Sequence, residues 1–193
     1  MPLRRMRFKW DADEFFLPDC RDDTLPPKGN CLSMDDRIFH DLENMTDVAR
    51  GGVLTIGNFD GVHLGHQRIL RTARGIADAE DIHVVAMTFE PPPERVLHPD
   101  GVPQRICPHE ERCRRLIEAG ADYVAVAKTG KLLLDMSPDE FVEKLIEGVF
   151  EPRHMIEGRN FFFGLARAGN VNTLREAGDR HGFGVKTVDP VEI

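Results

Sequence analysis

Short apolar runs alternate with segments of helical spacing along most of this chain, and this alternation constrains the fold more than any other feature. Strands are expected at 53–57, 82–90, 122–127, 153–158 and 184–191, and helices at 66–79, 108–120, 137–150 and 170–183. Parallel neighbours in a sheet need crossover connections, which the helices supply. The sequence therefore predicts an α/β fold with a Rossmann-like, doubly wound parallel sheet of about five strands and helices on both faces.

Residues 1–33 differ from the remainder of the chain. They contain Pro2, Pro18, Pro26 and Pro27 among charges of both signs, without a sustained period. Such a composition predicts an N-terminal extension that is mostly irregular or flexible. Residues 34–193 are expected to form one domain, because this length is sufficient for a single hydrophobic core.

Composition excludes several classes of protein. The formal net charge of −8 argues against a general nucleic-acid binder, which usually has a basic face. No apolar run is long enough to span a membrane, and no apolar segment follows the basic N-terminus as in a signal peptide. The cysteines Cys20, Cys31, Cys107 and Cys113 lack C-x-x-C spacing, which favours free thiols in a cytoplasmic protein.

The turn GNFDGVHLGH, residues 57–66, joins the first expected strand to the first expected helix. A helix N-terminus offers unpaired N–H groups and the positive end of the helix dipole, and glycines allow close approach of an anion. His63 and His66 are about one helical turn apart, so both rings can face the same ligand. The turn is neither a Walker A loop nor an H-E-x-x-H metal site. It therefore predicts a phosphate site.

This turn resembles the H-x-G-H signature of the nucleotidyltransferase superfamily, in the form found in bacterial FAD synthetases. These are the N-terminal modules of bifunctional riboflavin kinase/FMN adenylyltransferases. The resemblance covers the chain from about residue 36 to its end. The segments that carry it beyond the turn are TFEPPP (88–93), EERCRRLIEAG followed by DYV (110–124), SPDEFV (137–142), GRNFFFG (158–164) and RAGN (167–170).

The resemblance implies that AMP is transferred from ATP to FMN by direct in-line attack, giving FAD and pyrophosphate, with Mg²⁺ accompanying ATP. The implied catalytic residues, which contact phosphates, are His63, His66 and Asn160. The implied ATP-binding residues are Gly57, Asn58, Phe59, Asp60, Gly61 and Gly65, while Phe89, Pro91 and Phe163 are implied on the flavin side. Arg167 is implied as a further nucleotide- or flavin-binding residue. Magnesium would be held by phosphate oxygens more than by protein ligands, so no protein metal site is expected.

Structural roles remain open for several of these residues. Phe89 and Phe163 can equally belong to the core, and Asn160 can cap a turn. Asp60 can brace the turn through backbone N–H groups without contacting ATP.

Two departures from the family pattern keep a second class of function open. The S-S-T-x-I-R segment that follows the fifth strand in the family would begin after Ile193, and no riboflavin kinase barrel is present. The sequence thus suggests an adenylyltransferase domain truncated at its C-terminal end, with a kinase module in a longer chain as its partner. The alternative is a non-catalytic nucleotide- or flavin-binding fragment. Another H-x-G-H nucleotidyltransferase is disfavoured by the segments at 88–93 and 158–164.

Overall fold

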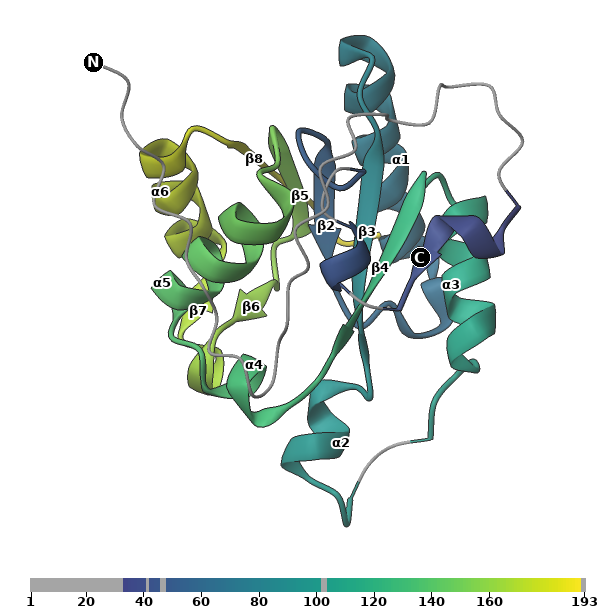
Figure 1. The fold of residues 1–193 in the computed structure, drawn as a ribbon, viewed down its shortest axis with the longest axis vertical. Helices are drawn as coiled ribbons and strands as arrows, with labels where there is room; N and C mark the ends of the chain where they lie inside the picture. The colour runs from purple at the N-terminus through teal and green to yellow at the C-terminus, as the bar shows by residue number, and fades with distance from the viewer. Residues whose placement is uncertain (1–32, 41, 46–47, 102–103, 192–193) are drawn as a thin grey trace.

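A computed structural model describes residues 33–40, 42–45, 48–101 and 104–191 (Figure 1). Apart from Ser33, the expected N-terminal extension lies outside the described residues, as do Cys20 and Cys31. Cys107 and Cys113 are buried free thiols, as expected.

The centre of the molecule is a parallel sheet of six strands in the order β1-β4-β3-β2-β5-β8. The strands are β1 (Ile38–Phe39), β2 (Val53–Ile56), β3 (Val84–Glu90), β4 (Tyr123–Lys128), β5 (His154–Gly158) and β8 (Gly184–Val188). The predicted parallel sheet is confirmed, with one strand more than expected. β1 was missed because two residues are too short to show a strand period.

Helices cover both faces of this sheet (Figure 1). On one face, α1 (Leu64–Glu80) and α3 (His109–Glu118) bury Leu70 and Leu116 against alternate residues of the strands, such as Val53. On the other face, α6 (Val171–His181) and the segment of α5 (Pro138–Glu140) and π-helix η4 (Phe141–Phe150) pack on Leu54 and its face neighbours. All four residues of β2 are buried, as expected for a central strand covered on both sides.

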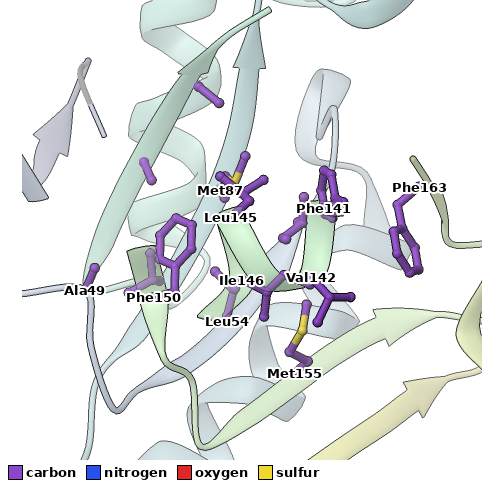
Figure 2. Packing of buried hydrophobic residues seen from close by; sticks show 14 of the residues in the cluster. Ala49, Leu54, Met87, Phe141, Val142, Leu145, Ile146, Phe150, Met155 and Phe163 are labelled. Carbon is purple, nitrogen blue, oxygen red and sulfur yellow. The ribbon is translucent and has the colours of Figure 1, made fainter. Parts of the chain in front are cut away.

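Figure 2 shows the second of these layers. Phe150, Leu145 and Ile146 of η4 lie over Leu54 of β2 and Met87 of β3, and all five side chains are buried. The helix begins as expected, because Ser137 and Glu140 form a capping box. After the first turn the segment continues as a π-helix to Phe150, which the sequence pattern did not indicate.

The strand order reverses between β2 and β5. From β2 the chain adds β3 and then β4 on one side, where the earlier strand β1 forms the edge, whereas β5 and β8 extend the sheet on the other. In open parallel sheets the crevice beyond the carboxyl ends of the strands at this switch point is where ligands bind. The turn that follows β2 therefore lies at the position expected for a binding site.

Several short elements gather at the carboxyl edge of the sheet, the lower edge in Figure 1. They are the helices α2 (Pro93–Leu97) after β3 and α4 (Lys131–Asp135) after β4, and the antiparallel pair β6 (Phe162–Phe163) and β7 (Gly169–Asn170), joined by η5 (Leu165–Arg167). The remaining short elements are η1 (Asp35–Arg37), η2 (Leu42–Met45) and η3 (Asp60–Val62). None was expected, because segments this short have no readable periodicity. No helix in the described residues is long and apolar enough to cross a membrane.

Candidate functional site

The candidate site begins where β2 ends and the chain turns sharply into α1. Phe59, Gly61 and Val62 have φ of 48°, 70° and 43°, which is the left-handed region. Phe59 and Val62 are buried at 2% and 3% exposure, so packing holds a conformation that such residues rarely adopt. Gly61 is required for a second reason, because a Cβ there would lie 2.9 Å from Ile106 Cγ2. The turn is thus held rigidly by its surroundings.

His63 and His66 stack on one another at the start of α1. Their ring centroids are 3.6 Å apart with an interplanar angle of 19°. His63 is the N-cap, and its Nδ1 accepts the backbone N–H of His66 at 3.4 Å. Gly65 leaves room for this ring, since a Cβ there would lie 3.1 Å from His63 Cε1. The helix starts at Leu64, two residues before the predicted start, so His63 lies outside the helix and His66 within its first turn.

His66 is held as a neutral imidazole. Burial and the neighbouring His63 lower its pKa from 6.5 to about 4, and Asp60 opposes this only in part. Phe59 covers the ring edge-on, with centroids 5.1 Å apart. Within the described part of the chain, Nδ1 of His66 is buried without a hydrogen-bond partner. A neutral imidazole has one N–H donor, and a ring beside a helix N-terminus is placed to donate it to an anion.

Asp60 braces the turn against the loop before α3. Its carboxylate accepts the backbone N–H of Ile106 at 3.0 and 3.1 Å and that of Cys107 at 3.3 Å. Asn58 is fixed as well, because its carbonyl accepts the Thr88 hydroxyl at 3.3 Å. The side chains of Asp60 and Phe59 therefore have structural roles, and they hold the backbone of the turn in place.

A cavity of about 500 Å³ opens beside this turn, between η3, α1 and α3. Its lining consists of Gly61, Val62, Gln67, Arg71, Arg115, Glu118 and Ala119. Neither stacked histidine lines it, so we place the candidate site at the histidine pair and not in this cavity.

The loop after β3 is anchored by an ionic cluster around Glu90. Arg105 makes two hydrogen bonds of 2.8 and 2.9 Å to this carboxylate, and the buried Arg112 adds a third at 3.1 Å. Burial raises the pKa of Glu90, but the bonds and charges of Arg105, His109 and Arg112 outweigh it, so the pKa is lowered. A cis peptide bond then joins Glu90 to Pro91. The cluster fixes the strand end that carries Phe89 and Pro91.

Of the residues expected on the flavin side, two are core residues. Phe89 and Phe163 are 9% and 5% exposed and belong to the same buried cluster. The Phe163 ring lies 5.3 Å from that of Phe141. Their faces are therefore largely covered by protein in this structure, and any contact with a ligand would be at their edges.

The hairpin after β5 instead exposes an aromatic ring that the sequence analysis did not single out. Phe162 is 46% exposed, and the Arg167 guanidinium lies over it at 4.9 Å from the ring centroid. No carboxylate of the described residues pairs with Arg167. Phe162 and Phe163 form β6, and Phe161 directly precedes it. Alternate side chains of a strand face opposite sides, so this spacing was the sequence signal that Phe162 lies on the other side from Phe161 and Phe163.

Asn160 is exposed in the turn between β5 and β6. Its Oδ1 folds over Gly158, where a Cβ would lie 2.9 Å away. The turn itself is closed by the Phe161 N–H and the Gly158 carbonyl at 3.0 Å. Among the residues that the structure describes, the Asn160 amide has no hydrogen-bond partner, so it does not cap the turn.

No group of three or more metal-ligating side chains occurs in residues 33–40, 42–45, 48–101 and 104–191. The one carboxylate of the turn, Asp60, is already engaged with backbone N–H groups. The described residues therefore do not form a protein cage for a metal ion.

Residues 45–193 match the sequence profile of the FAD synthetase family. This chain belongs to that family. The match includes the whole turn from β2 to α1 and the hairpin after β5. The resemblance identified from the sequence motifs is thereby confirmed.

Similar proteins agree with this assignment. The chain is 34% identical over 147 residues to the bifunctional riboflavin kinase/FMN adenylyltransferase of Haemophilus influenzae, and 31% identical over 150 residues to that of Escherichia coli. These matches cover 76% and 77% of this chain but 48% of either relative. The chain thus spans about half the length of the curated relatives it matches.

A crystal structure of a macrolide-efflux protein from Streptococcus pneumoniae is similar in fold. Its TM-score is 0.70 at 24% sequence identity, over 81% of this chain and 50% of that one. At this identity the likeness supports the α/β fold alone.

Proposed function

We propose that this chain is an FMN adenylyltransferase, which transfers AMP from ATP to FMN and releases pyrophosphate. The observation that carries the proposal is the stacked pair of His63 and His66 at the N-terminus of α1, directly beyond β2 at the switch point of the sheet. Parallel sheets bind nucleotides at this place, and helix N-termini bind phosphate. The similar proteins named as FMN adenylyltransferases supply the identity of the acceptor.

In the proposed reaction an oxygen of the FMN phosphate attacks the α-phosphorus of ATP. A new phosphorus–oxygen bond forms as the bond to the β-phosphate oxygen breaks, and pyrophosphate leaves. The attacking phosphate is already anionic near pH 7, so no side chain is needed as a general base. His63, His66 and the backbone N–H groups of the turn would act by holding the triphosphate and stabilising charge on the departing group.

The flavin would lie on the side of β6 and β7. Arg167 and the Asn160 amide are exposed groups suited to phosphate oxygens, and Phe162 offers a flat apolar face. Phe89, Pro91 and Phe163 would support this region from the protein side.

Magnesium enters the proposal as part of the substrate. Because the described residues form no metal cage, the ion would be bound by the phosphate oxygens of ATP. A riboflavin kinase module in a longer chain and a cytoplasmic location, both expected from the sequence, remain parts of the proposal.

The test is FAD formation from FMN and ATP in the presence of magnesium, followed by chromatography of the flavins. Replacing His66 by Ala removes one donor to the developing charge, for which losses of about 10²–10³ in turnover are typical. His181→Ala is the matched control, because His181 lies in the last turn of α6 and outside the proposed site. If His66→Ala forms FAD as fast as His181→Ala, the role proposed for His66 is wrong. If ATP binds but no FAD forms, the chain is a binding module and not an enzyme.

A further inference from the structure

Glu157 is a buried acid at the point where β2 and β5 part. It lies within β5 and is 2% exposed. The two strands pair in register at Val53 with His154 and at Leu54 with Met155. Beyond this, the N–H of Ile56 donates not to a β5 carbonyl but to Oε1 of Glu157 at 2.7 Å. The carboxyl therefore completes the ladder where the backbone pairing stops.

This position connects Glu157 to both sides of the candidate site. Ile56 is the last residue of β2, and Gly57 begins the turn that leads to the stacked histidines. On its own strand, Glu157 precedes Gly158, over which the Asn160 amide folds. The hydrogen bond to Ile56 thus ties the start of the phosphate-binding turn to the strand that leads to the hairpin.

No cation compensates this carboxyl among the described residues. Burial raises the pKa of Glu157 well above 4.5, and only the Ile56 N–H opposes that rise. Its register partner on β8 is Thr187, a neutral residue. Two cations on adjoining elements are engaged elsewhere, since Arg159 pairs with Asp189 and Arg175 of α6 donates to Thr187 and Asn172.

We propose that Glu157 is a positioning residue of the nucleotide site, which holds the end of β2 as an uncharged carboxylic acid. Its carbonyl-type oxygen accepts the Ile56 N–H, and its proton removes the charge that would otherwise face bound phosphates. The assignment of ATP as the ligand rests on the proposed function, whereas the uncharged state of the carboxyl does not.

The neutral form has a consequence for ligand binding. An ionised carboxylate next to the turn would repel a triphosphate, and little water is present at a buried position to screen it. ATP binding and protonation of Glu157 should therefore favour one another, because linkage is reciprocal. Affinity for ATP should fall as pH rises through the raised pKa.

The first experiment needs no substrate. In the unfolded chain Glu157 loses its proton near 4.5, but in the folded protein it keeps it to a higher pH. The folded state then binds more protons than the unfolded state, so this residue lowers stability progressively as pH rises across that window. The thermal stabilities of wild type and Glu157→Gln should therefore diverge as pH rises above about 4.5, and the stability of the variant should increase relative to that of the wild type.

Glu143→Gln is the matched control, because it makes the same substitution at an exposed position on η4. If the difference in thermal stability between wild type and Glu157→Gln does not change with pH, or changes in the same way as for Glu143→Gln, the carboxyl of Glu157 is not held uncharged. Glutamine keeps an acceptor for the Ile56 N–H, so this variant is expected to fold.

The second experiment measures ATP binding by calorimetry over the same pH range. Wild-type affinity should fall about tenfold relative to Glu157→Gln at the alkaline end, the size expected for one added charge near the phosphates. Titrations of ATP and of the histidines are common to both proteins and cancel in the comparison. Coincident profiles in two proteins that bind ATP would overturn the positioning role while leaving the proposed function intact.

A different result separates the two proposals. If neither protein binds ATP at any pH, the proposed function is wrong and Glu157 has no role at a nucleotide site. The unfolding measurements would still decide whether the carboxyl is uncharged.

Discussion

At the scale of single residues, the site depends on two imidazoles whose environments differ. His63 is exposed and caps α1, whereas His66 is partly buried between the rings of Phe59 and His63. Stacking at 3.6 Å would be unfavourable for two charged rings, and the lowered pKa of His66 avoids that repulsion. His66 can therefore offer a neutral hydrogen-bond donor to a polyphosphate at physiological pH.

His66 should make the protein sensitive to acid. Its folded-state pKa of about 4 is below its ordinary 6.5, so the unfolded chain binds more protons between these values. The free energy of unfolding should then fall as pH drops through this window. We expect His66→Gln to reduce this slope when urea unfolding is compared at several pH values. An unchanged slope would contradict the burial of a neutral ring.

At the scale of elements, the turn after β2 is held by a residue of its own and by a distant loop. Asp60 spans from η3 to the segment before α3 through the N–H groups of Ile106 and Cys107. The contact connects two loops at the same edge of the sheet, and both precede helices on the same face. The contact should therefore reduce the mobility of both loops.

Replacing Asp60 by Ala should release the loop before α3. Hydrogen bonds to a charged acceptor contribute about 1.5–3 kcal/mol when shielded, and less at a partly exposed position such as this one. We expect faster hydrogen exchange at Ile106 and Cys107, with exchange in β3 unchanged. Asp60→Asn, which retains one acceptor oxygen, should have a smaller effect. Equal exchange in all three proteins would show that the contact is not maintained in solution.

At the scale of the whole molecule, the sheet separates two apolar layers that must form together. Alternate residues of the same strand belong to different layers, as Val53 and Leu54 do in β2. Damage to either layer should therefore be transmitted to the sheet and to the site at its carboxyl edge.

Phe150 is a suitable probe of this coupling, because its ring is fully buried at the end of η4 (Figure 2). Phe150→Ala should lower the free energy of unfolding by about 3–5 kcal/mol, since it removes apolar contacts and leaves a cavity. Phe150→Leu should cost less, because it retains most of the volume. Urea denaturation measures both. A loss below about 1 kcal/mol for the alanine variant would contradict the packing described for this layer.

Local periodicity was sufficient to predict the main elements of the fold. The central strands and the four long helices lie near the expected positions. A strand buried on both sheet faces needs a continuous apolar run, and a helix buried on one face needs apolar residues with a period near 3.6. The capping box at Ser137 was readable for the same reason, as it depends only on residues three apart.

The candidate site was predicted only in part. The histidine pair and the glycines were found because one short turn carries them. The exposed Phe162 was missed, since a run of three phenylalanines does not indicate which ring faces solvent. Glu90, with Arg105 and Arg112, was missed because its partners are 15 and 22 residues away in the sequence.

By itself, the sequence determined which segments form the main strands and helices and which glycine-rich turn leads into α1, because these features depend on neighbours within a few positions. Only the tertiary structure decided the charge state of His66, the bracing role of Asp60 and the contact of Glu157 with Ile56 across a strand boundary. Those properties depend on burial and on partners 46 to 101 residues apart, which local pattern does not encode.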